Sequence, residues 1–379
     1  MKNSSYRICS RCLYDTTIPG IRFDSNGVCQ YCTIHDELEK QYRINDLSAG
    51  RLANILKKIK KHGWKKKYDC VVGVSGGVDS TYTLYKAVNL GLKPLAVHFD
   101  NGWNSEIAVN NIEVVTRKLN VDLETIVADW EEFKLLQKSF LLASVSDAEI
   151  PTDVTIHAVL HQVAAQENIH YVLIGHSFRT EGVVPKTWTY MDGKYIDSVH
   201  KIFSGKRLQS LPRLTLSRLL YYWFVKKIHS IPLLNYIPYD KAIAATILEK
   251  ELGWRNYGGH HHESLYTVFF QSYYLPKKFG IDKRILALSA RVRSGSIGRE
   301  DALEQIKRSP YPLDEKIVDY AIKKLGLSAE DFKNIMSAPI KSFVDYPTYF
   351  PLVQFFWFPL FIAYKLNLVP KILYYKFKG

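Results

Sequence analysis

The stretch of sequence that decides the fold reads Tyr68-Asp69-Cys70-Val71-Val72-Gly73-Val74-Ser75-Gly76-Gly77-Val78-Asp79-Ser80-Thr81. Its first half is a short apolar run typical of a buried strand. A Ser-Gly-Gly-Val-Asp-Ser turn follows, and then a helical segment from Thr81 to Asn89. A strand, a glycine-rich turn and a helix in this order point unpaired backbone N–H groups and the positive end of the helix dipole at one spot. The sequence therefore predicts an anion site at this turn.

The residue types of the turn fit a phosphate group. Gly76 and Gly77 let the backbone approach an oxyanion without an intervening Cβ, while Ser75, Ser80 and Thr81 add hydroxyl donors. The Gly-Lys-Ser/Thr end of a Walker loop is missing. The alternative is a glycine-rich turn that only joins a strand to a helix. The match of the whole turn in its strand–turn–helix context favours the phosphate site.

Composition limits the class of protein without selecting a function. The 379 residues leave room for two or three domains. With 51 Lys and Arg against 37 Asp and Glu, the net charge is +14, which suits nucleic acid, anionic lipid or a phosphorylated substrate. The first thirty residues contain no apolar stretch typical of a signal peptide, and four of the five cysteines form two CxxC pairs. We expect a cytoplasmic, metal-binding protein without disulfides.

The paired cysteines predict a separate module over residues 1–45. Sixteen residues lie between Cys9-x-x-Cys12 and Cys29-x-x-Cys32, which is the spacing of a zinc ribbon. Four cysteines close the coordination shell of Zn²⁺, so a structural site is expected rather than a catalytic one. An iron–sulfur cluster is the alternative, because four cysteines also suit iron.

Residues 46–200 alternate between strand and helix patterns. A polar helical linker, Asp46 to Lys61, comes first. The expected strands and helices are Cys70–Val74, Leu95–Phe99, Leu123–Val127 and Tyr171–Ile174, with Ala108–Leu119 and Thr155–Glu167 between them. This alternation predicts a parallel sheet covered on both faces, with ligands at the carboxyl ends of the strands. The Ser75–Ser80 loop, the Asp100-Asn101-Gly102 turn and Gly175-His176-Ser177 all follow predicted strands.

Residues 201–340 read as a mostly helical region for substrate or partner binding. The expected helices are Leu216–Ile228, Lys241–Leu252, Arg299–Lys307, Leu313–Leu325 and Ala329–Met336. Ser328-x-x-Asp331 announces the last of them as a capping box with Asp in place of Glu.

Residues 341–379 form an apolar, aromatic C-terminal arm. The stretch from Tyr349 to Pro370 is about long enough to cross a bilayer, but prolines and polar residues interrupt it. Three interpretations stay open: a packed terminal arm, an interfacial segment that touches an anionic membrane, and a membrane span.

Several polar side chains are candidates for the site. Asp100 is placed to meet the adenosine of a nucleotide, although Asp-Asn-Gly is also ordinary turn chemistry. Asp79 can hold Mg²⁺ beside phosphates. His262 and Glu263 suit substrate hydrogen bonding or acid/base work, with a plain polar loop as the alternative, and they lack the spacing of a metal motif.

Basic residues near position 290 offer cations to a phosphate-bearing or carboxylate-bearing substrate. These candidates are Lys283, Arg284, Arg291, Arg293 and Arg299, and a solvated helix face explains half of them just as well. Cys70 lies inside the first predicted strand, where a small core residue is expected rather than a nucleophile.

Read together, the motifs point to a family. The turn after the first strand resembles the PP-loop of ATP pyrophosphatases, which hold the β- and γ-phosphates while a substrate oxygen attacks the α-phosphorus. The whole chain resembles the N-acetyl sugar amidotransferase family of surface-polysaccharide biosynthesis. The motifs that carry this resemblance are Cys-x-x-Cys-Leu-Tyr-Asp-Thr-Thr with the second CxxC, Ser-Gly-Gly-Val-Asp-Ser-Thr, Phe-Asp-Asn-Gly-Trp, His-His-Glu-Ser-Leu-Tyr-Thr, Leu-Pro-Lys-Lys-Phe-Gly-Ile-Asp-Lys-Arg and Ser-Gly-Ser-Ile-Gly-Arg-Glu-Asp-Ala-Leu.

The resemblance implies an α/β fold and a reaction. The fold is a parallel-sheet PP-loop core, like that of the adenine nucleotide alpha hydrolases, with an N-terminal zinc-ribbon module and a helical C-terminal part. The reaction converts the acetamido group of a nucleotide-linked sugar, typically a UDP-diacetamido uronic acid, into an acetamidino group. ATP is cleaved to AMP and pyrophosphate, and the product serves lipopolysaccharide O-antigen biosynthesis. ATP, Mg²⁺ and one structural Zn²⁺ are the implied cofactors.

The same resemblance assigns roles and partners. Asp79, His262 and Glu263 are the expected catalytic residues, and Cys9, Cys12, Cys29 and Cys32 the metal ligands. The expected ATP-binding residues are Ser75, Gly76, Gly77, Val78, Asp79, Ser80, Thr81, Asp100 and Gly175. Those for the sugar nucleotide are His176, His262, Glu263, Lys283, Arg284 and Arg291. The chain has no recognisable glutaminase segment, so ammonia is expected from separate glutaminase and cyclase-like subunits, which resemble the two parts of imidazole-glycerol-phosphate synthase.

Two other functions compete with this interpretation. A tRNA 2-thiolation enzyme also combines CxxC pairs, a PP-loop and positive charge. Against it, Cys70 is the only cysteine outside the metal module and is predicted to be buried, so no thiol is available to carry persulfide sulfur. A thiolase that depends on an iron–sulfur cluster escapes this objection. A zinc-ribbon adaptor with a degenerate nucleotide domain is the third reading, and the intact loop argues against it. We expect no nucleic acid partner.

Overall fold

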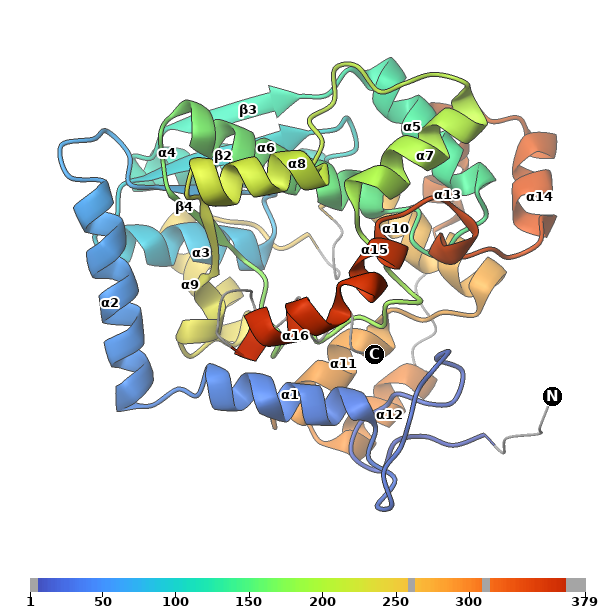
Figure 1. Ribbon diagram of the computed structural model, residues 1–379, viewed down its shortest axis with the longest axis horizontal. Coiled ribbons are helices and arrows are strands. Elements are labelled where there is room, and N and C mark those ends of the chain that lie inside the picture. The colour runs from blue at the N-terminus through green and yellow to red at the C-terminus, as the bar shows by residue number, and fades with distance from the viewer. Residues whose placement is uncertain (1–5, 258–262, 309–313, 366–379) are drawn as a thin grey trace.

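A five-stranded parallel sheet lies in the upper left part of the molecule as drawn in Figure 1. The computed structural model describes residues 6–257, 263–308 and 314–365. The strand order is β3-β2-β1-β4-β5. The strands are β1 (Cys70–Gly73), β2 (Pro94–Asp100), β3 (Leu123–Val127), β4 (Tyr171–Ile174) and β5 (His229–Pro232), and each pairs in parallel with its neighbours. The predicted parallel sheet and its first four strands are confirmed.

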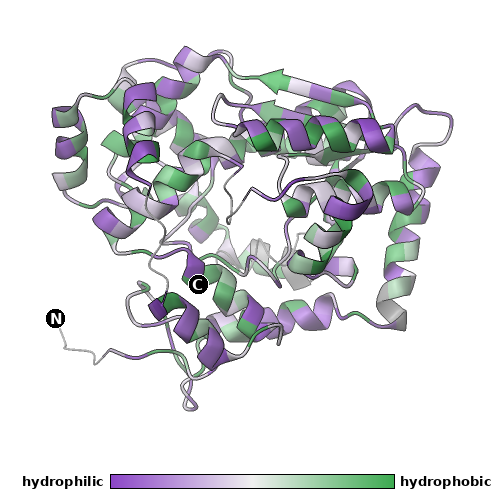
Figure 2. Cartoon of the chain, turned by 180° about the vertical axis from the view of Figure 1, so that it is seen from behind, coloured by the Kyte–Doolittle hydropathy of each residue, from purple (hydrophilic) through white to green (hydrophobic). Residues whose placement is uncertain are grey.

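Alternate residues of the central strands point to opposite faces of the sheet, and each face carries its own core. Val71 and Val97 pack on one side, among side chains of α5 (Trp130–Leu142), α6 (Ile150–Gln166) and α7 (Gly193–Ser204). Val72 and Ala96 pack on the other, among side chains of α3 (Val78–Asn89), α4 (Glu106–Leu119) and α9 (Lys241–Leu252). Burial on both faces explains why the strands read as continuous apolar runs in the sequence. Figure 2 shows hydrophilic and hydrophobic residues alternating along the helices outside the sheet.

The N-terminal module has little regular sheet. Two isolated antiparallel bridges, Ile8 with Asp15 and Phe23 with Cys29, shape its two cysteine turns. The second turn runs directly into α1 (Gln30–Gln41), so Cys32 lies in the first turn of a helix. The sequence predicts the cysteine turns but not this helix. The linker helix α2 (Asp46–His62) follows as predicted and leads into β1.

The C-terminal part is helical, as predicted. Besides β5 and α9, its elements are α8 (Leu216–Leu220) with η1 (Tyr221–Val225), η2 (Leu233–Tyr236), α10 (Leu265–Phe269) with η3 (Phe270–Phe279), α11 (Arg284–Arg293), α12 (Arg299–Arg308), α13 (Glu315–Lys324), α14 (Ala329–Ser337), η4 (Phe343–Asp345), α15 (Phe350–Phe355) and α16 (Trp357–Lys365). The capping box of Ser328 and Asp331 at the start of α14 is confirmed. The helix expected up to Ile228 ends earlier, because the chain leaves η1 to enter β5. Within the described residues no helix has the length and apolar character needed to cross a membrane.

Candidate functional site

The candidate site lies at the carboxyl ends of β1 and β4. These strands are neighbours, while β2 and β3 lie on one side of them and β5 on the other. In parallel α/β sheets, ligands bind in the crevice where the strand order reverses. The Ser75–Ser80 loop follows β1, and Gly175 follows β4. The fold therefore brings together two of the three features that the sequence singled out.

Gly76 fixes the path of the phosphate loop. Its φ of +80° lies in the left-handed region, and a Cβ at this position would be 2.4 Å from the carbonyl oxygen of Ala108. Its own carbonyl oxygen accepts a hydrogen bond from Nε1 of the buried Trp254 at 2.8 Å. Asn111 supports the same region, with its Nδ2 3.4 Å from that oxygen. The loop is held by backbone and buried side chains, so glycine is required at this position.

The loop leaves donors available for an anion. Gly77 is the extended residue before α3, and it has no side chain that could cap the N–H groups of the first helical turn. Ser80 Oγ lies 3.1 Å from Ser75 Oγ and accepts from the Ser75 N–H at 3.1 Å. Two hydroxyls and the helix N-terminus thus surround one spot. This geometry agrees with the predicted anion cradle, while the contacts to ATP stay a prediction.

Asp79 in the first turn of α3 is paired with residues at or just before the start of α9. Tyr239 donates its hydroxyl to Oδ1 at 2.6 Å, and Lys241 Nζ lies 2.8 Å from Oδ2. Burial alone would lower the pKa of Lys241, but the adjacent Asp79 carboxylate raises it above its usual value. Burial and the charge of Asp79 raise the pKa of Tyr239. In this arrangement Lys241 neutralises Asp79, and the role of Asp79 as an Mg²⁺ ligand stays a prediction.

Sequence reasoning missed Tyr239 and Lys241. The available signal was the segment Tyr239-Asp240-Lys241, in which Asp240 caps the start of α9 by accepting from the N–H groups of Ala242 and Ile243. The cap could be read from the sequence, but the approach of α9 to α3 could not. Lys241 brings a second positive element to the loop, beside the N-terminus of α3.

Glu263 lies against the phosphate loop. A Cβ on Gly77 would be 3.3 Å from Glu263 Oε1 and 3.2 Å from the hydroxyl oxygen of Tyr257. The carbonyl oxygen of Glu263 accepts from the Ser105 N–H at 2.8 Å, which anchors it near the end of β2. Burial, and then the charge of Glu263, raise the pKa of Tyr257. The structure thus brings Glu263 to the loop, whereas its predicted partner His262 lies outside the described residues.

The predicted site residues after β2 and β4 make different contacts within the protein. Asp100 Oδ1 accepts from the Gly102 N–H at 2.8 Å and from Asn104 Nδ2 at 3.0 Å, which is the turn chemistry offered as the alternative. Its contact with adenosine stays a prediction. Gly175 allows the backbone after β4 to pack directly against the backbone of α3, since a Cβ at Gly175 would be 2.9 Å from the carbonyl carbon of Asp79. His176 pairs through Nδ1 with Glu181.

The lysine and arginines predicted to bind substrate lie in α11 or directly before it. Two of them form ion pairs with acidic residues of the chain. Lys283 Nζ is 2.9 Å from Glu149 Oε2 at the start of α6. Arg284 pairs with Asp282, two residues before it. Arg291 is half-buried on the same helix. Their roles toward the substrate stay predictions, and the ion pairs show that two of these cations serve local structure as well.

The four predicted metal ligands converge on one point. Their Sγ atoms all lie within 4.8 Å of one another, and all four cysteines are buried. The distances are 3.8 Å between Cys9 and Cys32, and 3.7 Å from Cys29 to both Cys12 and Cys32. Four sulfurs bound about 2.3 Å from one tetrahedral ion are about 3.8 Å apart, so these residues fit a single ion. Cys70 lies apart in β1, where burial raises its pKa well above the usual value.

A buried arginine contacts the cysteine cluster. Arg293 at the end of α11 is 6% exposed, its Nη2 donates to Cys12 Sγ at 3.1 Å, and its guanidinium lies 4.4 Å from the ring centre of Tyr14. Its Nε and Nη1 have no hydrogen-bond partner among the described residues. A buried cation needs compensating negative charge, and thiolates supply it. No pattern in the sequence predicts that Arg293, rather than another arginine of α11, contacts the cysteines.

Arg179 connects the cysteine module to the loop that follows β4. It follows β4 and forms a bidentate pair with Glu39 of α1, with Nε 2.6 Å from Oε1 and Nη2 2.8 Å from Oε2. Nη2 also donates to the carbonyl oxygen of Tyr42 at 2.9 Å. The module is thereby fixed to the segment that carries Gly175 and His176.

Two family models match parts of the chain. Residues 263–357 match the C-terminal domain of LPS biosynthesis protein WbpG-like proteins, and residues 69–181 match queuosine biosynthesis protein QueC. No curated protein matches the chain. These two matches confirm the resemblance to the N-acetyl sugar amidotransferases within the PP-loop superfamily. They support an ATP-using PP-loop enzyme with a link to lipopolysaccharide biosynthesis.

Solved structures match this chain with low identities and low TM-scores. They include the U34-tRNA thiolase NcsA from Methanococcus maripaludis with its 4Fe-4S cluster, which is 14% identical. That match covers 90% of this chain and 97% of the thiolase, with a TM-score of 0.33. NMN synthetase from Francisella tularensis is 17% identical over 48% of this chain and 96% of its own, with a TM-score of 0.28. Scores this low do not support a transfer of function.

Proposed function

We propose that this chain is the synthetase subunit of an ATP-dependent amidotransferase. Its substrate is a nucleotide-linked N-acetyl sugar, in particular a UDP-diacetamido uronic acid, and its product carries an acetamidino group for O-antigen biosynthesis. One observation carries the proposal. The region that matches the WbpG-like domain begins at Glu263, and the carboxylate of Glu263 lies at the phosphate loop of the region that matches QueC. The two matched regions thus contribute to one site.

The chemistry requires activation of an amide. The carbonyl oxygen of an acetamido group is a poor leaving group, so ammonia does not displace it directly. Attack of this oxygen on the α-phosphorus of ATP forms a C–O–P bond, breaks the bond to the β-phosphate oxygen and releases pyrophosphate. Ammonia then adds to the imidoyl carbon. The C–O bond breaks, AMP leaves with the former acetamido oxygen, and an amidine remains.

The residues of the site suit this sequence of steps. The N–H groups at the start of α3, the hydroxyls of Ser75 and Ser80 and the ammonium group of Lys241 can stabilise the charge that develops on pyrophosphate. Glu263, whose carboxylate lies beside Gly77, is a candidate to accept a proton from the attacking ammonia. Mg²⁺ bound to the phosphates would add further charge neutralisation. Most of the catalysis comes from positioning and electrostatics.

For the cysteine cluster we propose one structural Zn²⁺. Three of the six distances between Sγ atoms are 3.7–3.8 Å and all lie within 4.8 Å, which supports a single tetrahedral ion. In a four-iron cluster each cysteine binds a different corner of a cube, which holds the sulfurs farther apart. The role is structural because four cysteines leave no open position, and because Arg179 and Arg293 fasten the module to the loop after β4 and to α11.

For the ammonia supply we propose separate glutaminase and cyclase-like subunits. The proposal rests on the resemblance to the family and on the lack of a recognisable glutaminase segment in the sequence. The positive charge of the chain then serves an anionic sugar nucleotide, and we expect no tRNA partner.

The test is a reconstitution with defined components. The chain is incubated with ATP, Mg²⁺, ammonium and UDP-acetamido sugars, and the products are identified by mass spectrometry. We expect an amidine that is one mass unit lighter than the substrate, formed together with AMP. Lys241→Met should lose this activity, whereas Lys250→Met, which changes an exposed residue of the same helix, should keep it. Incorporation of sulfur into tRNA, with no amidine from any sugar, would replace the proposal with the thiolase function.

A further inference from the structure

The helical stretch of α8 and η1 exposes most of its apolar side chains. Within residues 216–225, which are all described, Tyr222 alone is buried. The exposed apolar residues, with exposed fractions between 37% and 67%, are Leu216, Leu219, Leu220, Tyr221, Phe224 and Val225. A soluble helix normally buries such a stripe and leaves polar residues in water. This stretch instead leaves its apolar side chains exposed along with its polar ones.

The helices α15 and α16 repeat the pattern. Trp357 and Phe361 pack inward against the core of the cysteine module. The neighbouring Phe355 and Phe358 are 80% and 69% exposed, and Ile362, one turn on from Phe358, is 43% exposed. α16 is therefore apolar on the side that packs against the protein and on the side that faces away. A helix that is apolar all round is expected to be covered on all sides.

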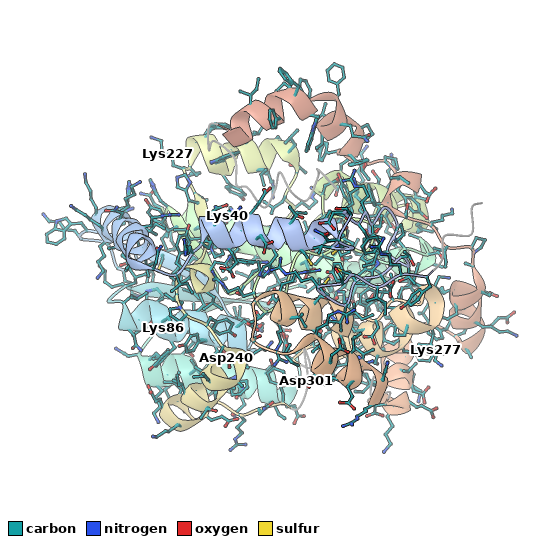
Figure 3. All side chains as sticks on the ribbon, turned by 90° about the horizontal axis from the view of Figure 1, so that it is seen from below. Lys40, Lys86, Lys227, Asp240, Lys277 and Asp301 are labelled. Carbon is teal, nitrogen blue, oxygen red and sulfur yellow. The ribbon has the colours of Figure 1, made fainter. Side chains whose placement is uncertain are left out.

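Both apolar stretches lie on one face of the molecule. Figure 1 shows α8 and α15–α16 on the side that faces the viewer. Figure 3, turned by 90°, shows the same helices at one edge of the molecule, with Lys227 labelled beside α8. We call the exposed residues of 216–225 and 350–362 the aromatic face. An apolar surface of this kind marks an interaction site.

The charge around the aromatic face is positive. Residues 198–239 contain no Asp or Glu but seven Lys and Arg, and residues 346–379 also lack any carboxylate side chain. Arg218 and Lys227 are exposed within or next to the α8–η1 stretch. Lys194 Nζ lies 5.7 Å from the ring centre of Tyr349, and Lys186 Nζ lies 5.4 Å from that of Phe350 at the start of α15. Cations and aromatic rings therefore border each other on this face.

We propose that the aromatic face docks on the surface of an anionic membrane. Helices of five to nine residues are too short to span a bilayer but can lie in its interface. Aromatic residues favour the boundary between head groups and acyl chains, and lysines and arginines beside them are attracted to anionic lipids. The bordering positive charge favours this partner over a second copy of the chain, whose own aromatic face is equally positive. The proposal does not depend on the amidotransferase activity.

The test is vesicle binding by the full-length chain. Vesicles of phosphatidylcholine alone are compared with vesicles that also contain phosphatidylglycerol, and bound protein is measured by co-sedimentation. We expect binding to the anionic vesicles only, and weaker binding as the salt concentration rises. The double variant Phe224→Ser/Phe358→Ser should lower the partition coefficient about tenfold or more. Both side chains are exposed, so the melting temperature should not fall.

A matched control lies elsewhere on the surface. Trp64 between α2 and β1 is 75% exposed and is followed by Lys65, Lys66 and Lys67, so it is also an aromatic residue among cations. Trp64→Ser should leave vesicle binding unchanged. The proposal is wrong if Trp64→Ser weakens vesicle binding as much as the double variant does. It is also wrong if the unchanged chain does not bind to anionic vesicles. If the unchanged chain forms a dimer and does not bind vesicles, and the double variant is a monomer, the aromatic face is the contact with a second copy of the chain.

Discussion

Replacement of Gly76 by alanine tests whether the phosphate loop has the geometry described here. At a φ of +80°, an L-residue is strained by about 1–2 kcal/mol. The added Cβ would also lie 2.4 Å from the carbonyl oxygen and 2.9 Å from the carbonyl carbon and Cα of Ala108. These are backbone atoms of α4, so they cannot rotate away as a side chain could. Overpacking of this kind costs about 1–3 kcal/mol more.

The matched control is Gly205→Ala. Gly205 ends α7 at a φ of +70°, and a Cβ there meets nothing within 4 Å. It should therefore suffer only the strain of about 1–2 kcal/mol, against a total of about 2–5 kcal/mol for Gly76→Ala. Gly76→Ala should also lose ATP turnover, because relief of the clash shifts the loop backbone and displaces the hydroxyls of Ser75 and Ser80, whereas Gly205→Ala should keep it.

Urea denaturation and steady-state turnover measure the two effects. Thermal shift with added ATP reports binding separately from catalysis. If Gly76→Ala unfolds no more easily than Gly205→Ala and turns over ATP at the same rate, the account of the loop is wrong. If Gly76→Ala is destabilised but turns over ATP normally, the loop is a structural turn and not the phosphate site.

Three further predictions concern the cation at the loop, the buried arginine and the ammonia source. Lys241→Met should lower kcat/KM for ATP about a hundredfold or more in steady-state kinetics. Because Asp79 raises the pKa of Lys241, ATP binding by the unchanged chain should not weaken between neutral pH and about pH 9, and a loss of affinity in that range would contradict this role. Arg293→Met should lower zinc affinity about 10–100-fold in chelator competition, while Arg291→Met on the same helix should not, and equal affinities would remove Arg293 from the metal centre. The chain alone should use ammonium, at a rate that rises with pH as more NH₃ is present, and should release no glutamate from glutamine until partner subunits are added. Glutamine use by the isolated chain would refute the proposal of separate subunits.

Much of the fold was readable from the sequence because its signals are local. Buried strands such as Tyr171–Ile174 appear as short apolar runs, and the Ser328 capping box marks a helix start within four residues. The spacing of the four cysteines in the sequence predicts that they lie together at one metal site. β5 escaped prediction because His229–Pro232 is short and contains a proline, and its pairing with β4 becomes evident only when the strands are assembled.

The site was less predictable because it depends on contacts between distant segments. Lys241 reaches Asp79 across 162 positions of the chain, and no local pattern distinguishes it from the other lysines of that region. Arg293 likewise differs from Arg291 only through its burial beside Cys12. Asp100 shows the opposite case, since its turn chemistry is local and was available as the alternative interpretation from the start.

Transfer of labelled oxygen tests the central claim most directly. The acetamido carbonyl of the sugar nucleotide is labelled with oxygen-18, and the reaction is run with ATP, Mg²⁺ and ammonium in unlabelled water. If the acetamido oxygen attacks the α-phosphorus, each AMP released carries the label and its mass rises by two units. AMP without the label would show that water attacks the nucleotide, and formation of ADP would show that the γ-phosphate is transferred. Either result would contradict the proposed reaction.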